Sequence, residues 1–249
     1  IADGDWSSDV CSSDLSQAIF EHYLPTGQES LVPETLTGAL LSIADKLDNL
    51  TGCFGLDMIP TGTQDPYALR RQALGIVRIV LEHGLRFSLP AAIKEAQGAY
   101  GHTDWKLSPP EAMQRLLDFF GQRIRIYFME QGYNTLVVDA VVGKGVDDIR
   151  SLEKRLLALD EFSRENEFEQ AVLTFKRADN IIRKQGGPAG TGLNGVFDPS
   201  LLVEPQEKAL AKRLEDLAPE WEKLWQKEEF QRLFALLWDL RPLVDAFFD

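Results

Sequence analysis

Chemically reactive side chains are scarce in this 249-residue chain, which has two cysteines, three histidines and three methionines. The chain contains no CxxC or HExxH motif and no His-Asp pair, which excludes the common zinc and redox motifs. It also lacks a GxSxG nucleophile elbow. His22, His83 and His102 are scattered, so we expect surface or capping roles for them. These absences leave no self-sufficient active site.

Long hydrophobic runs and an excess of positive charge are absent too. No apolar run approaches the roughly 20 residues of a membrane-spanning helix. Acidic residues outnumber basic ones 39 to 26, giving a formal charge of -13. This balance argues against indiscriminate coating of nucleic acid, which depends on neutralising phosphates. It does not exclude a local basic face on an acidic body.

The first fifteen residues, IADGDWSSDVCSSDL, differ from the rest of the chain in composition. They contain no Lys or Arg and no apolar run of the length that a signal peptide requires. Asp5 to Leu15 resembles the translation of a sequencing adapter over eleven consecutive residues. We therefore predict that residues 1–15 are an artefact and that the natural chain begins near Ser16 with its upstream portion missing.

Excluding residues 1–15 changes two global properties. Their four aspartates leave the count, so the formal charge changes from -13 to -9. Cys11 also leaves, and Cys53 then stands alone, so it cannot form an internal disulfide. A single thiol indicates a reducing compartment, and we expect the cytoplasm. Cys53 itself is expected to be a small, half-buried structural residue.

Apolar residues at steps of three and four predict helices along the chain. No strand with a pairing partner is evident, so the predicted fold class is all-α. Asp65-Pro66 and the SPPE box at Ser108–Glu111 predict helix starts, and Gly84 predicts a helix end. The predicted helices cover about 35–51, 66–83, 90–99, 109 to at least 128, 135–142, 147–162, 165–184, 204–217, 219–227 and 228–239.

Two segments rich in glycine and polar residues interrupt this pattern. GAYGHTDWKLSPP, Gly98–Pro110, is the best candidate for a domain boundary. It separates a domain at 16–105 from a second domain at 106–249. GGPAGTGLNGVFDPS lacks a Walker lysine and a complete dinucleotide fingerprint, so we interpret it as a mobile loop.

The helix SIADKLDNL offers the one candidate metal carboxylate. Asp45 and Asp48 lie three residues apart and share one side of the helix. The simplest interpretation is a solvated acidic edge. ADKLDNL also resembles the last motif of HD-type metal phosphohydrolases, in which Asp45 would be a ligand. That family also needs an upstream His and a His-Asp pair. His22 is the only upstream His here and the chain contains no His-Asp pair, so we predict no metal site.

A second helix, AVLTFKRADNIIRK, concentrates positive charge. Its predicted inward stripe is Ala171, Phe175, Ala178 and Ile182. One interpretation of the opposite face is compensation of the helix dipole by basic residues in the last turns. The other is a surface that positions phosphates, where an asparagine can also read base edges. Its members are Lys176, Asn180, Arg183 and Lys184, with Arg177 at the flank, and a second basic cluster comprises Arg115, Arg123 and Arg125.

Sequence runs from both halves resemble the β subunits of bacterial glycyl-tRNA synthetases. The most specific piece is IPTGTQDPYALRRQALGIVRI, which resembles the region before the anticodon-binding domain of that family. YNTLVVDAVV, LLALDEF and FKRADNIIRK resemble the DALR-type helical anticodon-binding domain shared with arginyl-tRNA synthetase. The resemblance covers Ser16 to Asp249. It implies an HD-like helical region at 16–105 and a DALR-type helical bundle at 106–249, truncated at its C-terminus.

The resemblance implies a role in charging tRNA(Gly) with glycine. The family forms an α2β2 heterotetramer whose aminoacylation site, with ATP and Mg2+, is on the α subunit. The β subunit binds tRNA, so no catalytic residue, cofactor, membrane or DNA is expected for this chain. The HD-like region of the family is degenerate, so Asp45 is at most a vestigial ligand. The expected tRNA-binding residues are Lys176, Arg177, Asn180, Arg183, Lys184, Arg123 and Arg125.

Two other functions stay open at this point. An HD-type metal-dependent phosphohydrolase would require its missing His and His-Asp ligands upstream of Ser16. A helical interaction scaffold would require no nucleic-acid contact at all. The sequence of the intact gene would decide the first alternative, and tRNA binding by the basic face would decide the second.

Overall fold

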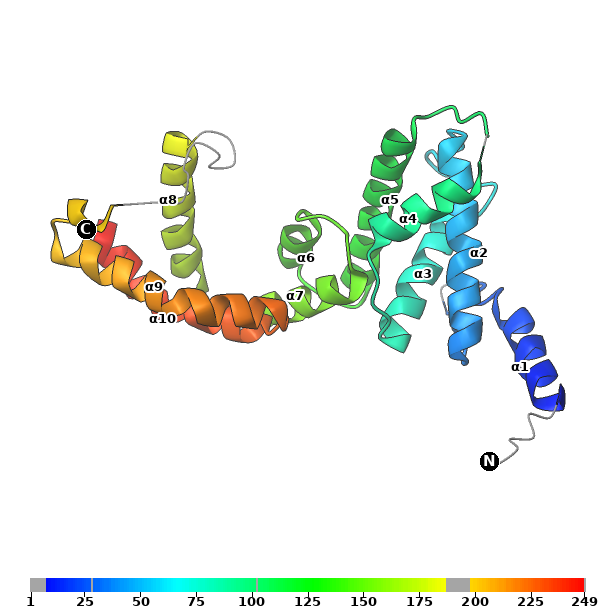
Figure 1. Ribbon diagram of the computed structural model, residues 1–249, viewed down its shortest axis with the longest axis horizontal. Coiled ribbons are helices and arrows are strands. Elements are labelled where there is room, and N and C mark those ends of the chain that lie inside the picture. The colour runs from blue at the N-terminus through cyan, green and yellow to red at the C-terminus, as the bar shows by residue number, and fades with distance from the viewer. Residues whose placement is uncertain (1–7, 28, 102, 187–197, 249) are drawn as a thin grey trace, which may run out of the picture. The chain divides into compact units, whose positions relative to one another are not determined.

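The computed structural model describes residues 8–27, 29–101, 103–186 and 198–248 of the chain (Figure 1). The described residues form ten α-helices and a short 3-10 helix at Pro199–Leu201. They contain no strand, only an isolated bridge between Thr61 and Gln64. The predicted all-α class is therefore confirmed. Within these same residues, no helix is long and apolar enough to cross a membrane. The glycine-rich part of the 186–200 loop lies outside the described residues, so its predicted mobility stays a prediction.

The chain divides into two compact units, Ile1–Glu153 and Lys154–Asp249. Helix α2 is the centre of the first unit and packs against four other helices, α1, α3, α4 and α5. Its C-terminal half supplies the buried side chains Leu47, Leu50 and Phe54. The first unit comprises α1 (Ser8–Glu21), α2 (Leu36–Gly55), α3 (Leu69–His83), α4 (Leu89–Ala99), α5 (Pro109–Glu130), α6 (Thr135–Val142) and the first turn of α7 (Ile149–Phe162).

The second unit is built on α10, which packs against both α9 and α8. One apolar cluster joins Ala158 of α7 to Leu224 of α9 and to Phe230 and Leu233 of α10. A second cluster, centred on Leu217, Leu240 and Val244, receives Phe175 from α8. The helices of this unit are α8 (Phe168–Gly186), α9 (Pro205–Gln226), α10 (Phe230–Phe248) and the remainder of α7.

The three helices predicted between residues 204 and 239 are wrong in number. Helix α9 continues through Pro219, and α10 continues through Pro242 to Phe248. A proline inside a helix removes one backbone hydrogen bond and favours a break. Here Leu217 and Leu224 are both buried on either side of Pro219, so packing of the whole helix outweighs the local preference.

Helix starts follow the sequence signals only in part. Helix α3 begins at Leu69 rather than at Pro66 as predicted. Both carboxylate oxygens of Asp65 still accept helix N–H groups, from Leu69 at 2.8 Å and from Arg70 at 3.0 Å. Ala68 between them adopts a left-handed φ of 53°. Asp65 therefore caps the helix across a turn, as an acceptor placed four residues before the first helical N–H.

The other predicted helix signals give two outcomes. Gly84 ends α3 in the left-handed conformation, with φ 63°, which confirms the predicted stop. Ser108 precedes α5 as predicted, but its side chain makes no capping hydrogen bond. Glu111 instead pairs with Arg115 at 2.7 Å. The SPPE sequence thus starts a helix through its prolines rather than through a closed capping box.

The segment predicted as a domain boundary lies inside the first unit. Its backbone is attached to the end of α2, because the N–H groups of Lys106 and Leu107 both donate to the carbonyl oxygen of Gly55. Helix α5, which follows the segment, packs against α2, α3 and α4. The division by packing therefore falls at Glu153 and Lys154, beyond the predicted boundary between residues 105 and 106.

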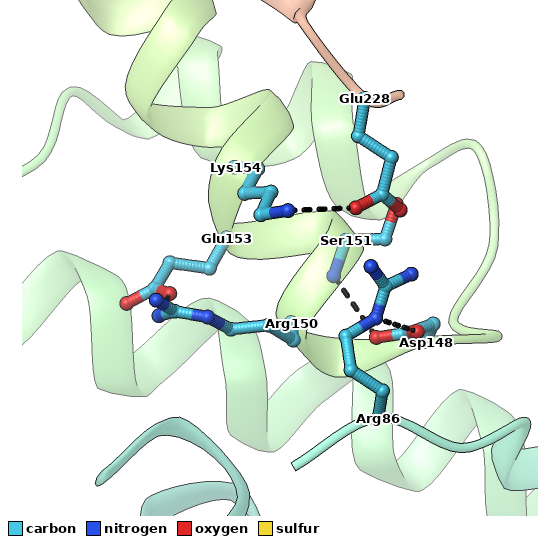
Figure 2. A network of polar contacts seen from close by, with 7 residues as sticks. All are labelled: Arg86, Asp148, Arg150, Ser151, Glu153, Lys154 and Glu228. Carbon is cyan, nitrogen blue, oxygen red and sulfur yellow. Dashed lines mark hydrogen bonds and ion pairs between the residues drawn. The ribbon is translucent and has the colours of Figure 1, made fainter. Parts of the chain in front are cut away.

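Polar contacts fix the start of α7 within the first unit (Figure 2). The side chain of Asp148 accepts the N–H of Ser151 at 3.0 Å and the Nε of Arg86 at 2.7 Å. The preceding residue, Asp147, accepts the backbone N–H of Leu89 at 2.8 Å. These contacts join the turn before α7 to the turn before α4. Within the second unit, Lys154 pairs with Glu228 at 2.9 Å.

Glu21 joins α1 to the start of α2 through a buried carboxylate. Its side chain is 1% exposed and accepts hydrogen bonds from both the backbone N–H and the hydroxyl of Thr35. Gln17 donates to its other oxygen at 2.8 Å. Burial alone raises the pKa of the Glu21 carboxyl, but the hydrogen bonds from Thr35 and Gln17 outweigh it and lower the pKa overall.

We expect Glu21→Gln to reduce the free energy of unfolding at pH 7 by about 1–2 kcal/mol, because one acceptor becomes a donor. The lowered pKa stabilises the fold above the carboxyl's unfolded pKa, and this contribution is lost as pH falls through the folded pKa. The difference between wild type and variant should therefore shrink under acid conditions. Urea unfolding at pH 7 and pH 4 measures it, with exposed Glu95→Gln as the control. A difference that is constant with pH would contradict the assignment.

Candidate nucleic-acid interface

Helix α8 presents one face to the second unit and the opposite face to solvent. Ala171 is buried and Phe175 packs into the cluster formed with α9 and α10, as predicted. The predicted inward position of Ile182 is wrong, because its side chain is 46% exposed and Ile181 is the half-buried residue there. Thr174 is buried instead and donates to Asp245 of α10 at 2.6 Å. The face that α8 buries is therefore rotated slightly about the helix axis from the face that the apolar stripe predicted.

Three predicted residues share the exposed face of α8 without a partner. Lys176, Asn180 and Lys184 are all exposed, and within the described part of the chain their side chains make no ion pair or hydrogen bond. Residues four apart on a helix lie on one face, and eight residues span about 12 Å along the axis. These three side chains therefore form a polar, positively charged row, here called the α8 row.

Two other predicted residues of this helix are already engaged. The guanidinium of Arg177 lies 4.5 Å from the centre of the Phe248 ring and donates to the carbonyl oxygen of Phe248 at 3.0 Å. Arg183 pairs with Asp179 at 2.6 Å, and this hydrogen bond and charge raise its pKa. Arg177 thus turns toward α10, and the charge of Arg183 is partly neutralised. Among the predicted residues of α8, the structure brings Lys176, Asn180 and Lys184 together as unpaired groups.

The predicted basic cluster on α5 does not form a common unpaired surface. Arg125 pairs with Asp139 of α6, which lowers the pKa of that carboxyl. Arg115 pairs with Asp57 and Glu111. Both charges are therefore partly neutralised within the first unit.

The third arginine of that cluster is partly buried in the first unit. The guanidinium of Arg123 is half-buried 5.4 Å from the centre of the Phe119 ring, and its buried Nε has no hydrogen-bond partner among the described residues. Burial lowers the pKa of Arg123, the neighbouring Arg70 lowers it further, and Asp65 opposes both. A desolvated side chain of this kind stabilises local packing better than it contacts a phosphate. We therefore rank Arg123 and Arg125 below the residues of the α8 row as candidates for contact with tRNA.

Sequence reasoning missed the apolar part of the exposed α8 surface. Leu173 is 63% exposed and Val172 is 44% exposed. At 100° per residue, Leu173 lies on the same side of the helix as Lys176 and Asn180. The sequence did indicate this exposure, because Val172 and Leu173 lie outside the predicted inward stripe. An exposed leucine beside lysines can contact the faces of unpaired bases.

The candidate metal residue lies on an exposed surface of α2. Asp45 is exposed, and its backbone carbonyl accepts the side-chain amide of Asn49 at 3.0 Å. His22 and His83 contact backbone carbonyls of Ile19 and Pro33, and His102 lies outside the described residues. Among the described residues, no group of three or more His, Cys, Asp or Glu side chains could hold a metal ion.

The run DPYALRRQALGIVRI has a structural role in the first unit. Besides the Asp65 cap, its arginines donate to backbone carbonyls: Arg70 to Gly62 at 2.7 Å and Arg71 to Thr26 at 3.1 Å. Arg78 donates to the carbonyls of Gly27 and Ser30. The most distinctive stretch of the sequence therefore fixes loops to α3.

The family model described as glycyl-tRNA synthetase beta subunit matches residues 7–143. This match covers more than half of the chain, so the chain belongs to the glycyl-tRNA synthetase beta subunit family.

Curated relatives extend the similarity over nearly the whole chain. A glycine--tRNA ligase beta subunit of Oleidesulfovibrio alaskensis is 56% identical over 235 residues, covering 94% of this chain and 34% of the relative. One from Solidesulfovibrio magneticus is 52% identical, covering 96% and 34%. One from Myxococcus xanthus is 37% identical, covering 94% and 33%. The chain thus spans about a third of the length of these relatives.

Neither the family match nor the described part of the fold separates residues 8–15 from the residues after them. The match begins at residue 7, and α1 begins at Ser8 and runs to Glu21 without a break. The adapter interpretation therefore gains no support here and stays a prediction.

Proposed function

We propose that this chain is the part of a glycine--tRNA ligase β subunit that binds tRNA(Gly) through the α8 row. The observation that carries this proposal is the set of exposed, unpaired side chains Lys176, Asn180 and Lys184 on an acidic chain. Lysines fix the register of a nucleic-acid backbone, and an unpaired base can pack its face against a neighbouring apolar side chain. Leu173 supplies such a group beside the row.

The proposed mechanism is positional. The helical bundle would hold the anticodon and body of the tRNA, so that the acceptor end reaches a partner subunit in a fixed orientation. Restricting the motion of a bound substrate lowers the entropic cost of the reaction at a distant centre. In this proposal the α subunit of an α2β2 assembly holds the aminoacylation site with ATP and Mg2+, in the cytoplasm. We assign no cofactor and no catalytic residue to this chain.

We expect Lys176→Glu combined with Lys184→Glu to weaken tRNA(Gly) binding on the order of tenfold at moderate salt. The negative slope of the logarithm of the association constant against the logarithm of salt concentration should become shallower by about 2, because two phosphate contacts are lost. Filter binding or fluorescence anisotropy over a salt series measures both quantities in the holoenzyme.

The matched control is Lys208→Glu combined with Lys212→Glu on α9. Both side chains are exposed, and this pair changes the net charge of the protein by the same amount. The control should lower affinity only slightly through the overall field. Equal losses in the two double variants would contradict the α8 row as a binding surface, while leaving the family assignment in place.

The domain assignment of the two regions is part of the same proposal. Residues 16–105 would be the HD-like helical region, and 106–249 the DALR-type anticodon-binding domain. The resemblance of YNTLVVDAVV and FKRADNIIRK to the latter supports it. We also infer that residues 1–15 derive from a sequencing adapter, supported by eleven consecutive matches; sequencing the gene across Ser16 tests this inference.

A further inference from the structure

The second unit contains a pocket between the end of α7 and the N-terminal half of α10 (the α7–α10 pocket). Its volume is about 320 Å³, at the lower end of the range for ligand sites. It therefore suits a single side chain better than a large cofactor. It is lined by Ala158, Glu161, Phe162, Glu165, Gln231, Phe234, Ala235, Trp238 and Asp239.

Aromatic rings form one wall of the α7–α10 pocket. Phe162 stacks on Phe234, with ring centres 4.9 Å apart and planes 15° apart. Trp238 stands perpendicular to Phe162, at 5.6 Å and 90°. The faces and edges of these rings fix one another, so the wall is preorganised. Aromatic faces attract cations through the ring quadrupole, and arginine does this most often in proteins.

Carboxylates surround the aromatic wall. Glu161, Glu165 and Asp239 are all exposed, and the lining contains no Lys, Arg or His. Glu161 accepts a hydrogen bond from Gln231. The side chains of Glu165 and Asp239 have no ion-pair or hydrogen-bond partner within the described part of the chain. This charge repels phosphates, so the pocket is unsuited to nucleic acid and differs from the α8 row.

The chain itself shows how this chemistry holds a guanidinium. On a neighbouring part of the same surface, Arg241 lies 5.7 Å from the centre of the Trp238 ring. It pairs with Glu167 at 2.8 Å and with Asp245 at 3.4 Å. Its side chain is only 16% exposed in this position. An aromatic ring flanked by two carboxylates therefore immobilises an arginine here, and the α7–α10 pocket offers the same groups with no cationic residue in its lining.

We propose that the α7–α10 pocket receives an arginine side chain from a protein partner, with the guanidinium on the aromatic wall and paired to Glu165 and Asp239. Arginine fits better than lysine because its planar guanidinium both stacks on rings and donates to two carboxylates. The pocket would thus anchor a partner protein on a surface of the second unit other than the α8 row.

Fluorine NMR of the full-length protein labelled with 5-fluorotryptophan tests the proposal. The Trp238 resonance is assigned from Trp238→Phe and followed during titration with a Gly-Arg-Gly peptide. A peptide with citrulline in place of arginine has nearly the same shape but no charge. We expect a saturable shift of the Trp238 resonance with the arginine peptide and none with the citrulline peptide.

A matched pair of variants locates the contacts. Glu165→Gln combined with Asp239→Asn should lower the affinity for the arginine peptide by at least about threefold, because two exposed charge pairs are lost. Glu215→Gln combined with Asp216→Asn on α9 changes the net charge equally and should leave the affinity unchanged. Equal weakening by both pairs, or no saturable shift in wild type, would overturn the proposal.

Two further titrations distinguish a protein partner from a small cation and from tRNA as the molecule that occupies the pocket. Spermidine binding as tightly as the arginine peptide would make this a small-cation site and overturn the assignment to a protein partner. A shift of the Trp238 resonance on adding tRNA that Lys176→Glu abolishes would assign the pocket to the tRNA surface and overturn it as well. The proposal does not depend on the tRNA-binding role of the α8 row, so the two can fail separately.

Discussion

Gly55→Ala should destabilise the first unit by about 3 kcal/mol, at the upper end of the usual cost of overpacking. An added Cβ would lie 1.6 Å from Cε3 and 1.7 Å from Cζ3 of the Trp105 indole, far inside any real contact. The indole cannot move easily, because its ring packs edge-on against Tyr100 at 5.4 Å. The next two backbone N–H groups are hydrogen-bonded to the carbonyl of Gly55 itself. Urea unfolding followed by circular dichroism measures the loss.

Gly98→Ala is the matched control for this substitution. Gly98 lies in α4, is exposed, and an added Cβ would meet no atom within 4 Å. Alanine is favoured over glycine inside a helix by about 1 kcal/mol, so this variant should be unchanged or slightly more stable. If Gly55→Ala unfolded at the same urea concentration as Gly98→Ala, the close packing of Trp105 on α2 would be wrong.

Lys46→Met should cost about 3 kcal/mol, although methionine preserves the length and apolar stem of the side chain. Lys46 is 5% exposed, and its ammonium donates to two backbone carbonyls, at 3.0 Å to His22 and 2.9 Å to Leu24. It also donates to the hydroxyl of Ser42 at 2.8 Å. Methionine removes all three hydrogen bonds and leaves the carbonyl of His22 without this donor, while the carbonyl of Leu24 keeps the hydrogen bond from the Ser42 hydroxyl. Lys94→Met on the exposed face of α4 is the control and should change stability by about 0.5 kcal/mol or less.

The pH dependence of the Lys46 effect has a definite sign. Burial lowers the pKa of the Lys46 ammonium, and the charge of Asp45 only partly offsets this. The unfolded chain therefore holds the proton to higher pH than the folded chain, so stability rises with pH between the two pKa values. The difference in free energy of unfolding between wild type and Lys46→Met should therefore increase as pH rises between these two pKa values. A gap that narrows would mean that the ammonium is not desolvated in the fold.

Helix positions were largely predictable from the sequence, because they depend on local periodicity. The stop at Gly84 and the helix at Thr135–Val142 are both found where the pattern predicts them. The continuation of α9 through Pro219 was not predictable, because it depends on burial of Leu217 and Leu224 against other helices. The energy of such contacts outweighs the local tendency of proline to break a helix, and these contacts join residues far apart in the chain.

The candidate site divides in the same way. Sequence spacing alone placed Lys176, Asn180 and Lys184 on one exposed face of a helix, and they lie there. It could not show that Arg177 turns to Phe248, since that ring is 71 residues away. The partial burial of Arg123 against Phe119 was equally out of reach, because periodicity does not say how deeply the flank of a helix is covered.

Short-range spacing was enough to predict the all-α class and most helix spans, and distinctive residue runs carried the family resemblance. The folded arrangement was needed to establish which charges are unpaired, where the two units divide, and that aromatic rings and carboxylates meet between α7 and α10. Pairing, burial and pocket formation depend on contacts between segments many residues apart, and no local pattern fixes those contacts in advance.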